Sequence, residues 1–156
     1  MPNYELMAKQ IRSLAEIDRD FVPLLSNAAA ILWEGLERVN WAGFYLMDKG
    51  SLLVGPFQGR AACVRIEVGK GVCGTAVARD QVQRVEDVHK FPGHIACDSA
   101  SRSEIVLPIH SGGRIVGVLD IDSPERARFT AEDERGLALV VEALESVADF
   151  SRLRLI

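Results

Sequence analysis

Residues 103–121 have the sequence SEIVLPIHSGGRIVGVLDI, which predicts a β-hairpin at the centre of the fold. Two apolar runs, Ser103–Ile109 and Arg114–Ile121, flank a polar turn that contains two glycines. Side chains alternate between the two faces of a strand, so one face of each strand carries only apolar residues. We expect that face of the hairpin to pack against helices.

Three carboxylates lie on the other face of the same strands. Asp120 and Asp122 share a face of the second strand, and Glu104 lies opposite the aliphatic residues of the first. Carboxylates on strands this apolar need a partner if they are buried. The pattern therefore favours a small pocket for a cation. As an alternative, Asp122 caps the end of its strand and Glu104 lies exposed where its strand begins.

The rest of the chain supplies helices and further strands around this hairpin. Strand periodicity places Trp41 and Tyr45 on one face of an earlier strand and Phe44 on the other. The predicted elements are helical residues 1–38 in two pieces broken near 18–23, strands at 40–47, 51–57, 62–68 and near 81–85, a polar loop at 86–102, and a helix that opens with a capping-box pattern at Thr130.

This order predicts an α+β fold in a chain of one domain, residues 1–156. The N-terminal helical segment spans 1–38, the sheet and the pocket loops span 40–122, and the C-terminal helix spans 130–153. The central sheet is expected to be mostly antiparallel with five or six strands. Helices from both ends of the chain would cover one face, and a ligand pocket would lie under loops on the other.

Composition and charge exclude several classes of protein. The chain is 48% apolar and 26% charged, which is ordinary globular usage, and its net charge is −4. That charge gives no electrostatic basis for binding nucleic acid or an anionic membrane, and no apolar run approaches the roughly 18 residues of a membrane span. Three cysteines without a recognisable signal peptide indicate free thiols in a reducing cytoplasm.

The glycines at 69–74 match the dinucleotide pattern GxGxxG, but their context argues against a dinucleotide site. About eight helical residues fit before the next strand, too few for the crossover of a parallel βαβ unit. We expect these glycines to form a tight strand-to-helix turn and to allow close backbone approach to the pocket.

The cysteines have no metal-binding or CxxC spacing, and His94 with Cys97 lacks the further ligands of a zinc site. Cys63 falls on the third predicted strand and Cys73 at the start of a short helix, where buried cysteine is commonly inert. Cys97 lies on the polar loop, where exposure favours reactivity.

Several linked motifs resemble the GAF-domain free methionine-(R)-sulfoxide reductases. The resemblance runs from about Asn40 to the last helix and includes the relative spacing of all three cysteines. The motifs are GPFQG at 55–59, AC at 62–63, GKGVCGTA at 69–76, PGHIACD at 92–98, SEIV at 103–106 and GVLDIDS at 117–123.

This resemblance implies a GAF fold and the reduction of free L-methionine-(R)-sulfoxide, without a cofactor. It implies that Cys97 attacks the sulfoxide and becomes a sulfenic acid, that Cys63 resolves it as a disulfide reduced by thioredoxin, and that Cys73 is an auxiliary or alternative resolving thiol. It assigns substrate binding to Glu104, Asp120, Asp122, Trp41 and Tyr45. It also implies a homodimer.

The residues give these implied roles a physical reason. Free methionine sulfoxide has an ammonium group that carboxylates can hold and an S-methyl group that aromatic rings can contact. Either Glu104 or Asp122 could donate the proton that the sulfoxide oxygen requires. Two other functions remain open at this point: a GAF sensor of a small molecule such as a cyclic nucleotide, and a redox-sensing protein that forms a disulfide without turnover.

Overall fold

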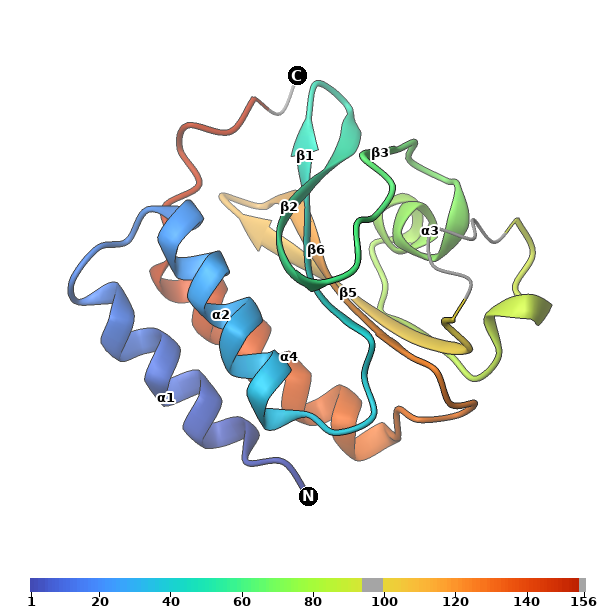
Figure 1. Cartoon of the computed structure of the whole chain (residues 1–156). Helices are drawn as coiled ribbons and strands as arrows, with labels where there is room; N and C mark the ends of the chain where they lie inside the picture. The colour runs from blue at the N-terminus through green and yellow to red at the C-terminus, as the bar shows by residue number, and fades with distance from the viewer. Residues whose placement is uncertain (94–99, 155–156) are drawn as a thin grey trace.

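A six-stranded antiparallel sheet separates two unequal layers of the protein (Figure 1). The computed structural model describes residues 1–93 and 100–154. The elements in chain order are α1 (Tyr4–Ala15), α2 (Phe21–Gly35), β1 (Trp41–Asp48), β2 (Ser51–Gly59), β3 (Arg65–Ile66), α3 (Gly71–Arg79), β4 (Gln83–Val85), the 3₁₀ helix η1 (Val88–Lys90), β5 (Ser103–Ser111), β6 (Arg114–Ser123) and α4 (Ala131–Val147).

The strand order is β3-β2-β1-β6-β5-β4, and every neighbouring pair is antiparallel. This confirms the predicted hairpin, which is the pair β5–β6. It also confirms the α+β class and the larger of the two predicted strand numbers. Strands β1 and β6 lie in the middle of the sheet, so their residues are the ones that both layers can bury.

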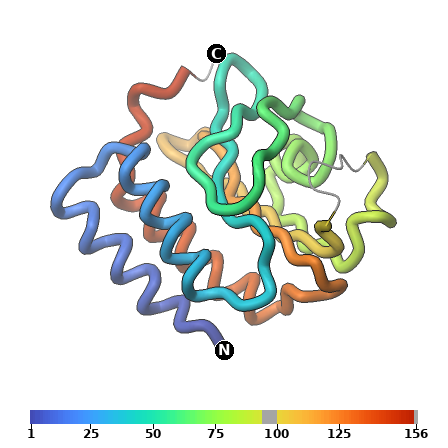
Figure 2. The backbone as a smooth tube through the Cα atoms, viewed as in Figure 1, coloured from blue at the N-terminus to red at the C-terminus, as the bar shows by residue number. Residues whose placement is uncertain are grey.

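One face of the sheet packs against the helices from both ends of the chain. Helices α2 and α4 cover this face and α1 packs against both of them. In the backbone tube, the blue and red ends of the chain lie together on this side, whereas the green segment with α3 lies on the other (Figure 2). Phe44, Ile105 and Ile121 are fully buried in this layer.

The ends of these helices follow the local signals in the sequence. Thr130 and Asp133 form the predicted capping box at the start of α4. Pro23 lies in the first turn of α2, where its missing N–H leaves no helical bond unmade. Asp20 caps this helix by accepting a hydrogen bond from the Val22 N–H.

Two predicted boundaries were wrong. The strand expected at 62–68 is only Arg65–Ile66, so Cys63 lies in the connection before β3 and not on a strand. The C-terminal helix ends at Val147 rather than at 153, because the chain turns there and packs Phe150 against Phe21 in α2. The apolar alternation at 62–68 predicts a longer strand than the one that forms. The C-terminal helix is likewise shorter than predicted.

The glycine-rich turn leads into α3, and its geometry agrees with the prediction. Gly69 and Gly71 both have positive φ, which L side chains rarely adopt, and a Cβ atom on Gly74 would collide with the Glu67 carbonyl oxygen. The next strand, β4, pairs antiparallel with β5. No parallel βαβ unit is therefore formed around this motif.

Candidate active site

A cavity lies between the sheet and α3, on the face away from α1, α2 and α4. It is small, partly open to solvent and lined by both polar and apolar side chains. Its lining includes five of the predicted substrate-binding residues and one of the cysteines: Trp41, Tyr45, Cys73, Glu104, Asp120 and Asp122.

Strand pairing brings the three acids together. Glu104 on β5 pairs with Asp122 on β6, and Asp122 pairs in turn with Trp41 on β1. Asp120 lies two residues away on the same face. The exposed fractions are 7% for Glu104, 5% for Asp120 and 9% for Asp122, so the alternative of an exposed Glu104 is wrong. The hairpin thus places three carboxylates in a buried layer.

Burial and mutual repulsion shift the pKa values of two of these acids. Burial, followed by repulsion from Asp120 and Asp122, raises the pKa of Glu104 well above its ordinary value. Burial also raises the pKa of Asp120, although hydrogen bonds from Glu104 and Cys73 oppose the increase. One carboxylate oxygen of Asp120, Oδ1, is buried without a hydrogen-bond partner. The site is therefore electrostatically prepared for a cation.

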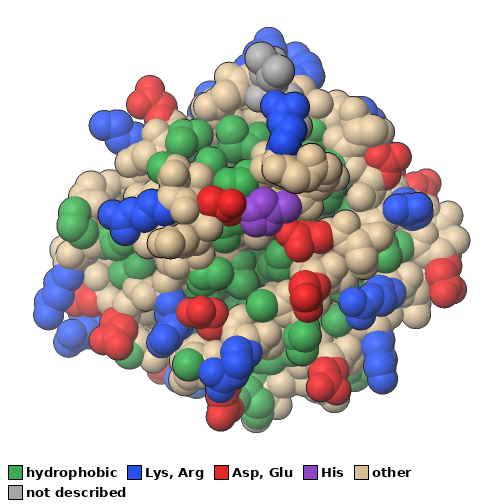
Figure 3. Space-filling view, turned by 180° about the vertical axis from the view of Figure 1, so that it is seen from behind, with side chains coloured by type: hydrophobic (Ala, Val, Ile, Leu, Met, Phe, Trp, Pro, Cys, Tyr) green, Lys and Arg blue, Asp and Glu red, His purple; other side chains and the backbone are tan. Residues whose placement is uncertain are grey.

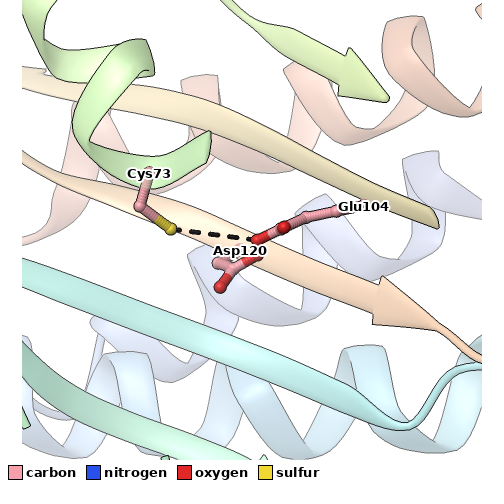
Figure 4. A group of neighbouring side chains, drawn as sticks. All are labelled: Cys73, Glu104 and Asp120. Carbon is pink, nitrogen blue, oxygen red and sulfur yellow. Dashed lines mark hydrogen bonds between the residues drawn. The ribbon is translucent and has the colours of Figure 1, made fainter. Parts of the chain in front are cut away.

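Cys73 faces this acidic layer from α3. Its Sγ lies 4.0 Å from Glu104 Oε2, as Figure 4 shows, and its thiol is free and buried. Burial, and then the negative charges of Asp120 and Glu104, raise the pKa of the thiol well above the ordinary value. Cys73 is therefore held as a neutral thiol in this arrangement, unlike an activated nucleophile.

Aromatic rings line the cavity beside the acids, on the same face of the sheet. Trp41 stacks on Tyr45 with 5.7 Å between ring centroids and on Phe57 with 5.0 Å. Gly43 makes this possible, because a Cβ there would occupy the position of the Phe57 Cβ. Sequence analysis found Trp41 and Tyr45 but missed Phe57, which lies on β2 beyond an interrupted alternation.

The polar ends of the same rings hold the segment that carries Cys63. Trp41 Nε1 donates a hydrogen bond to the Arg60 carbonyl at 3.1 Å, and the Tyr45 hydroxyl donates to the Cys63 carbonyl at 2.9 Å. Cys63 itself is disulfide-bonded. Cys97, the predicted nucleophile, lies outside the described residues.

Lys70 is a further lining residue that sequence analysis missed. It precedes α3, whose N-terminus has no side-chain cap, and helix N-termini favour anionic groups. The signal was present in the sequence, since Lys70 lies within the glycine turn that was expected to approach the pocket.

Comparison with known proteins places this site in a family. A family model for the GAF domain matches residues 18–147. Over 144 residues the chain is 56% identical to the free methionine-R-sulfoxide reductase of Escherichia coli K12, a match that covers 92% of this chain and 87% of that protein. The chain belongs to the GAF-domain free methionine-R-sulfoxide reductase family.

Solved structures in this family share the whole fold. The reduced form of fRMsr of Staphylococcus aureus gives a TM-score of 0.91 at 48% identity and covers 96% of this chain and 97% of that chain. The free methionine-R-sulfoxide reductase of Neisseria meningitidis, solved in complex with its substrate, gives 0.87 at 45% identity, with 92% and 86% covered. These matches confirm the predicted family and GAF fold.

Proposed function

We propose that this protein reduces free L-methionine-(R)-sulfoxide to L-methionine, with thioredoxin as the final reductant. One observation carries the proposal: three buried carboxylates, one with an unpartnered oxygen, line a small cavity together with a wall of stacked aromatic rings. An amino acid with an ammonium group and a small S-methyl group complements both walls. Membership of the reductase family supports the same substrate.

The acids would select the free amino acid over a methionine sulfoxide residue in a protein. The ammonium of the free substrate can satisfy Asp120 Oδ1 and neutralise its neighbours. In a peptide the same nitrogen is a neutral amide, so the buried carboxylates stay unpaired. The first turn of α3 and Lys70 are placed on the same cavity to receive the substrate carboxylate.

The chemistry we propose begins at Cys97. Its thiolate attacks the sulfoxide sulfur, the sulfoxide oxygen takes a proton and passes to Cys97 as a sulfenic acid, and methionine leaves. We assign the proton to Glu104, because burial raises its pKa and so favours the protonated form that a donor requires. This chooses between the two donors that the sequence left open.

The second half of the cycle restores the thiols. Cys63 attacks the Cys97 sulfenic acid, which releases water and leaves a disulfide, and two thiols of thioredoxin reduce this disulfide. The disulfide-bonded state of Cys63 and the free thiol of Cys73 support this division of labour. Hydrogen bonding from Tyr45 to the Cys63 carbonyl would hold the resolving segment beside the cavity.

An assay that follows each epimer of free methionine sulfoxide tests the proposal. With dithiothreitol as reductant, the R epimer should disappear and methionine should form in equal amount, whereas the S epimer should persist. Cys97→Ser should abolish turnover. Cys63→Ser should stop after one turnover with thioredoxin, and continued cycling would refute its resolving role. No consumption of the R epimer would overturn the proposed function, leaving the cyclic-nucleotide sensor or the disulfide-forming redox sensor.

The family resemblance also leads us to propose a homodimer that works in the cytoplasm. Sedimentation equilibrium of the purified protein measures the first, and a mass of one chain would contradict it. Among the described residues, none of the helices is long and apolar enough to cross a membrane.

A further inference from the structure

Cys73, Glu104 and Asp120 form a group that the proposed reduction does not fully use. Each offers one ligand atom, all three atoms lie within 4.8 Å of one another, and all three residues are buried. Figure 4 shows the three side chains converging from α3, β5 and β6. We call this group the thiol-carboxylate triad.

The spacing of the triad is close to that of ligands on a tetrahedral metal ion. Zinc bonds of about 2.3 Å to sulfur and about 2.1 Å to oxygen place those two ligand atoms about 3.6 Å apart. In the structure Cys73 Sγ and Glu104 Oε2 are 4.0 Å apart. This pair is therefore slightly farther apart than a tetrahedral zinc ion requires, and the ligand atoms of all three residues lie within 4.8 Å of one another.

A second observation concerns the hydrogen bonding of Asp120. Asp120 is only 5% exposed, and its Oδ1 has no hydrogen-bond partner. A buried carboxylate oxygen without a partner is unfavourable, and a metal ion satisfies it as well as an ammonium group does. The aromatic rings on the neighbouring strand offer no competing donor, because Trp41 and Tyr45 direct their N–H and O–H groups to backbone carbonyls.

We propose that the thiol-carboxylate triad binds Zn²⁺ or a similarly thiophilic divalent cation inside the substrate cavity. The thiolate ligand disfavours Mg²⁺ and Ca²⁺, which prefer larger sets of oxygen ligands. Binding releases the thiol proton of Cys73 to solvent and leaves a fourth position for water.

The bound ion occupies carboxylates that the proposed function assigns to the substrate ammonium. The regulatory consequence, which rests on the proposed function, is reversible inhibition: zinc and free methionine sulfoxide exclude each other. Zinc binding itself does not depend on that function.

Cobalt spectroscopy on a variant with one cysteine tests the site. The double substitution Cys63→Ser and Cys97→Ser leaves Cys73 as the sole cysteine of the chain. Titration with Co²⁺ should produce a thiolate-to-cobalt charge-transfer band that saturates at one equivalent and disappears when Zn²⁺ is added. Adding Cys73→Ser should remove the band. Absence of the band in the folded double variant, verified by circular dichroism, overturns the proposal.

Two neighbouring aspartates provide a matched control in the same background. Asp120→Asn removes a proposed ligand and should weaken Zn²⁺ binding at least about 100-fold, whereas Asp122→Asn, outside the triad, should weaken it less than about tenfold. Equal losses overturn the assignment. If Asp120→Asn does not fold, Glu104→Gln replaces it in the comparison.

Displacement separates this proposal from the reductase function. Free methionine-(R)-sulfoxide should remove the cobalt band from the double variant. A band that forms but survives saturating substrate overturns mutual exclusion while leaving the metal site in place. Failure of the reductase function would appear instead in the epimer assay, which uses no metal ion.

Discussion

The two faces of the sheet are built from alternate residues of the same strands, yet one face packs against helices and the other lines the cavity. On β1, Ala42 and Phe44 enter the helical layer, and Trp41 and Tyr45 enter the cavity. The helical layer buries aliphatic and aromatic side chains against α2 and α4. The cavity layer buries three carboxylates and a thiol. One layer stabilises the fold, and the other holds charge in a place where it is unfavourable without a ligand.

Because side chains alternate along a strand, neighbouring residues of β1 serve different purposes: one set stabilises the fold and the other lines the binding cavity. Burial of Glu104 and Asp120 opposes their ionisation, so the cavity stays unfavourable until a cation enters it. Apolar burial in the helical layer stabilises the fold and offsets the unfavourable burial of these acids. Unlike the cavity, where acids are buried together, the surface seen from behind Figure 1 has acidic and basic side chains interspersed, with acidic side chains beside a histidine (Figure 3).

The largest expected effect on stability comes from the helical layer. Phe44→Ala removes a fully buried ring and should lower the free energy of unfolding by about 3–5 kcal/mol, measured by urea denaturation. The kcat/KM of the fraction that remains folded should stay within a few-fold of the wild type. A large loss of activity in folded protein would show that the two layers are not separate.

Glu104→Gln should have the opposite effect. The folded pKa of Glu104 lies above its unfolded value. At neutral pH the carboxyl group is ionised in the unfolded chain but resists ionisation in the fold, which lowers the stability of the fold, so the isosteric amide should raise the free energy of unfolding by about 1–2 kcal/mol at pH 7. The gain should vanish as pH falls below the unfolded pKa. The same variant should lose at least about 100-fold in kcat/KM. Destabilisation at pH 7 would contradict this account of the cavity.

The pH dependence of turnover tests Glu104 as the proton donor. With a donor that must be protonated, kcat/KM should fall as pH rises through the raised pKa of Glu104 in the free enzyme. Single-turnover rates across pH measure this, and Glu104→Gln should lose the alkaline decline along with most of its rate. An unchanged profile in this variant would assign the proton to another group.

Tyr45→Phe removes one hydrogen bond between the two parts of the cavity wall. It should lower the free energy of unfolding by about 1 kcal/mol, because the Cys63 carbonyl loses its donor. Cycling with thioredoxin should slow more than the first turnover does. Equal slowing of both steps, measured by rapid quench, would place Tyr45 in substrate binding alone.

The smallest effect is expected on the surface. Burial alone would lower the pKa of His110, but hydrogen bonds to Asp80 and Glu145 raise it. His110→Gln should therefore cost about 0.5 kcal/mol at pH 5, given solvent screening of this partly exposed group. The cost should shrink as pH rises through the folded pKa. His89→Gln serves as a control, and a cost that grows with pH would contradict the assignment.

The sequence was sufficient for the faces of the sheet and insufficient for the connections around it. Alternation on β1, β5 and β6 identified Trp41, Tyr45, Glu104 and both aspartates, because period-two patterns are fixed by strand geometry. The connection that carries Cys63 was predicted as strand, since nothing in Ala62-Cys63-Val64 indicates where pairing stops. Phe57 was missed because its contact with Trp41 depends on tertiary packing, whereas Lys70 was missed although it lies in the glycine turn that was expected to approach the pocket.

The central claim is that the buried acids recognise a free ammonium group, and substrate discrimination tests it most directly. We would measure kcat/KM for free methionine-(R)-sulfoxide and for its N-acetyl derivative under identical conditions. The account predicts a preference for the free amino acid of at least about 10³-fold, since acetylation leaves buried carboxylates unpaired. Values within tenfold of each other would contradict it.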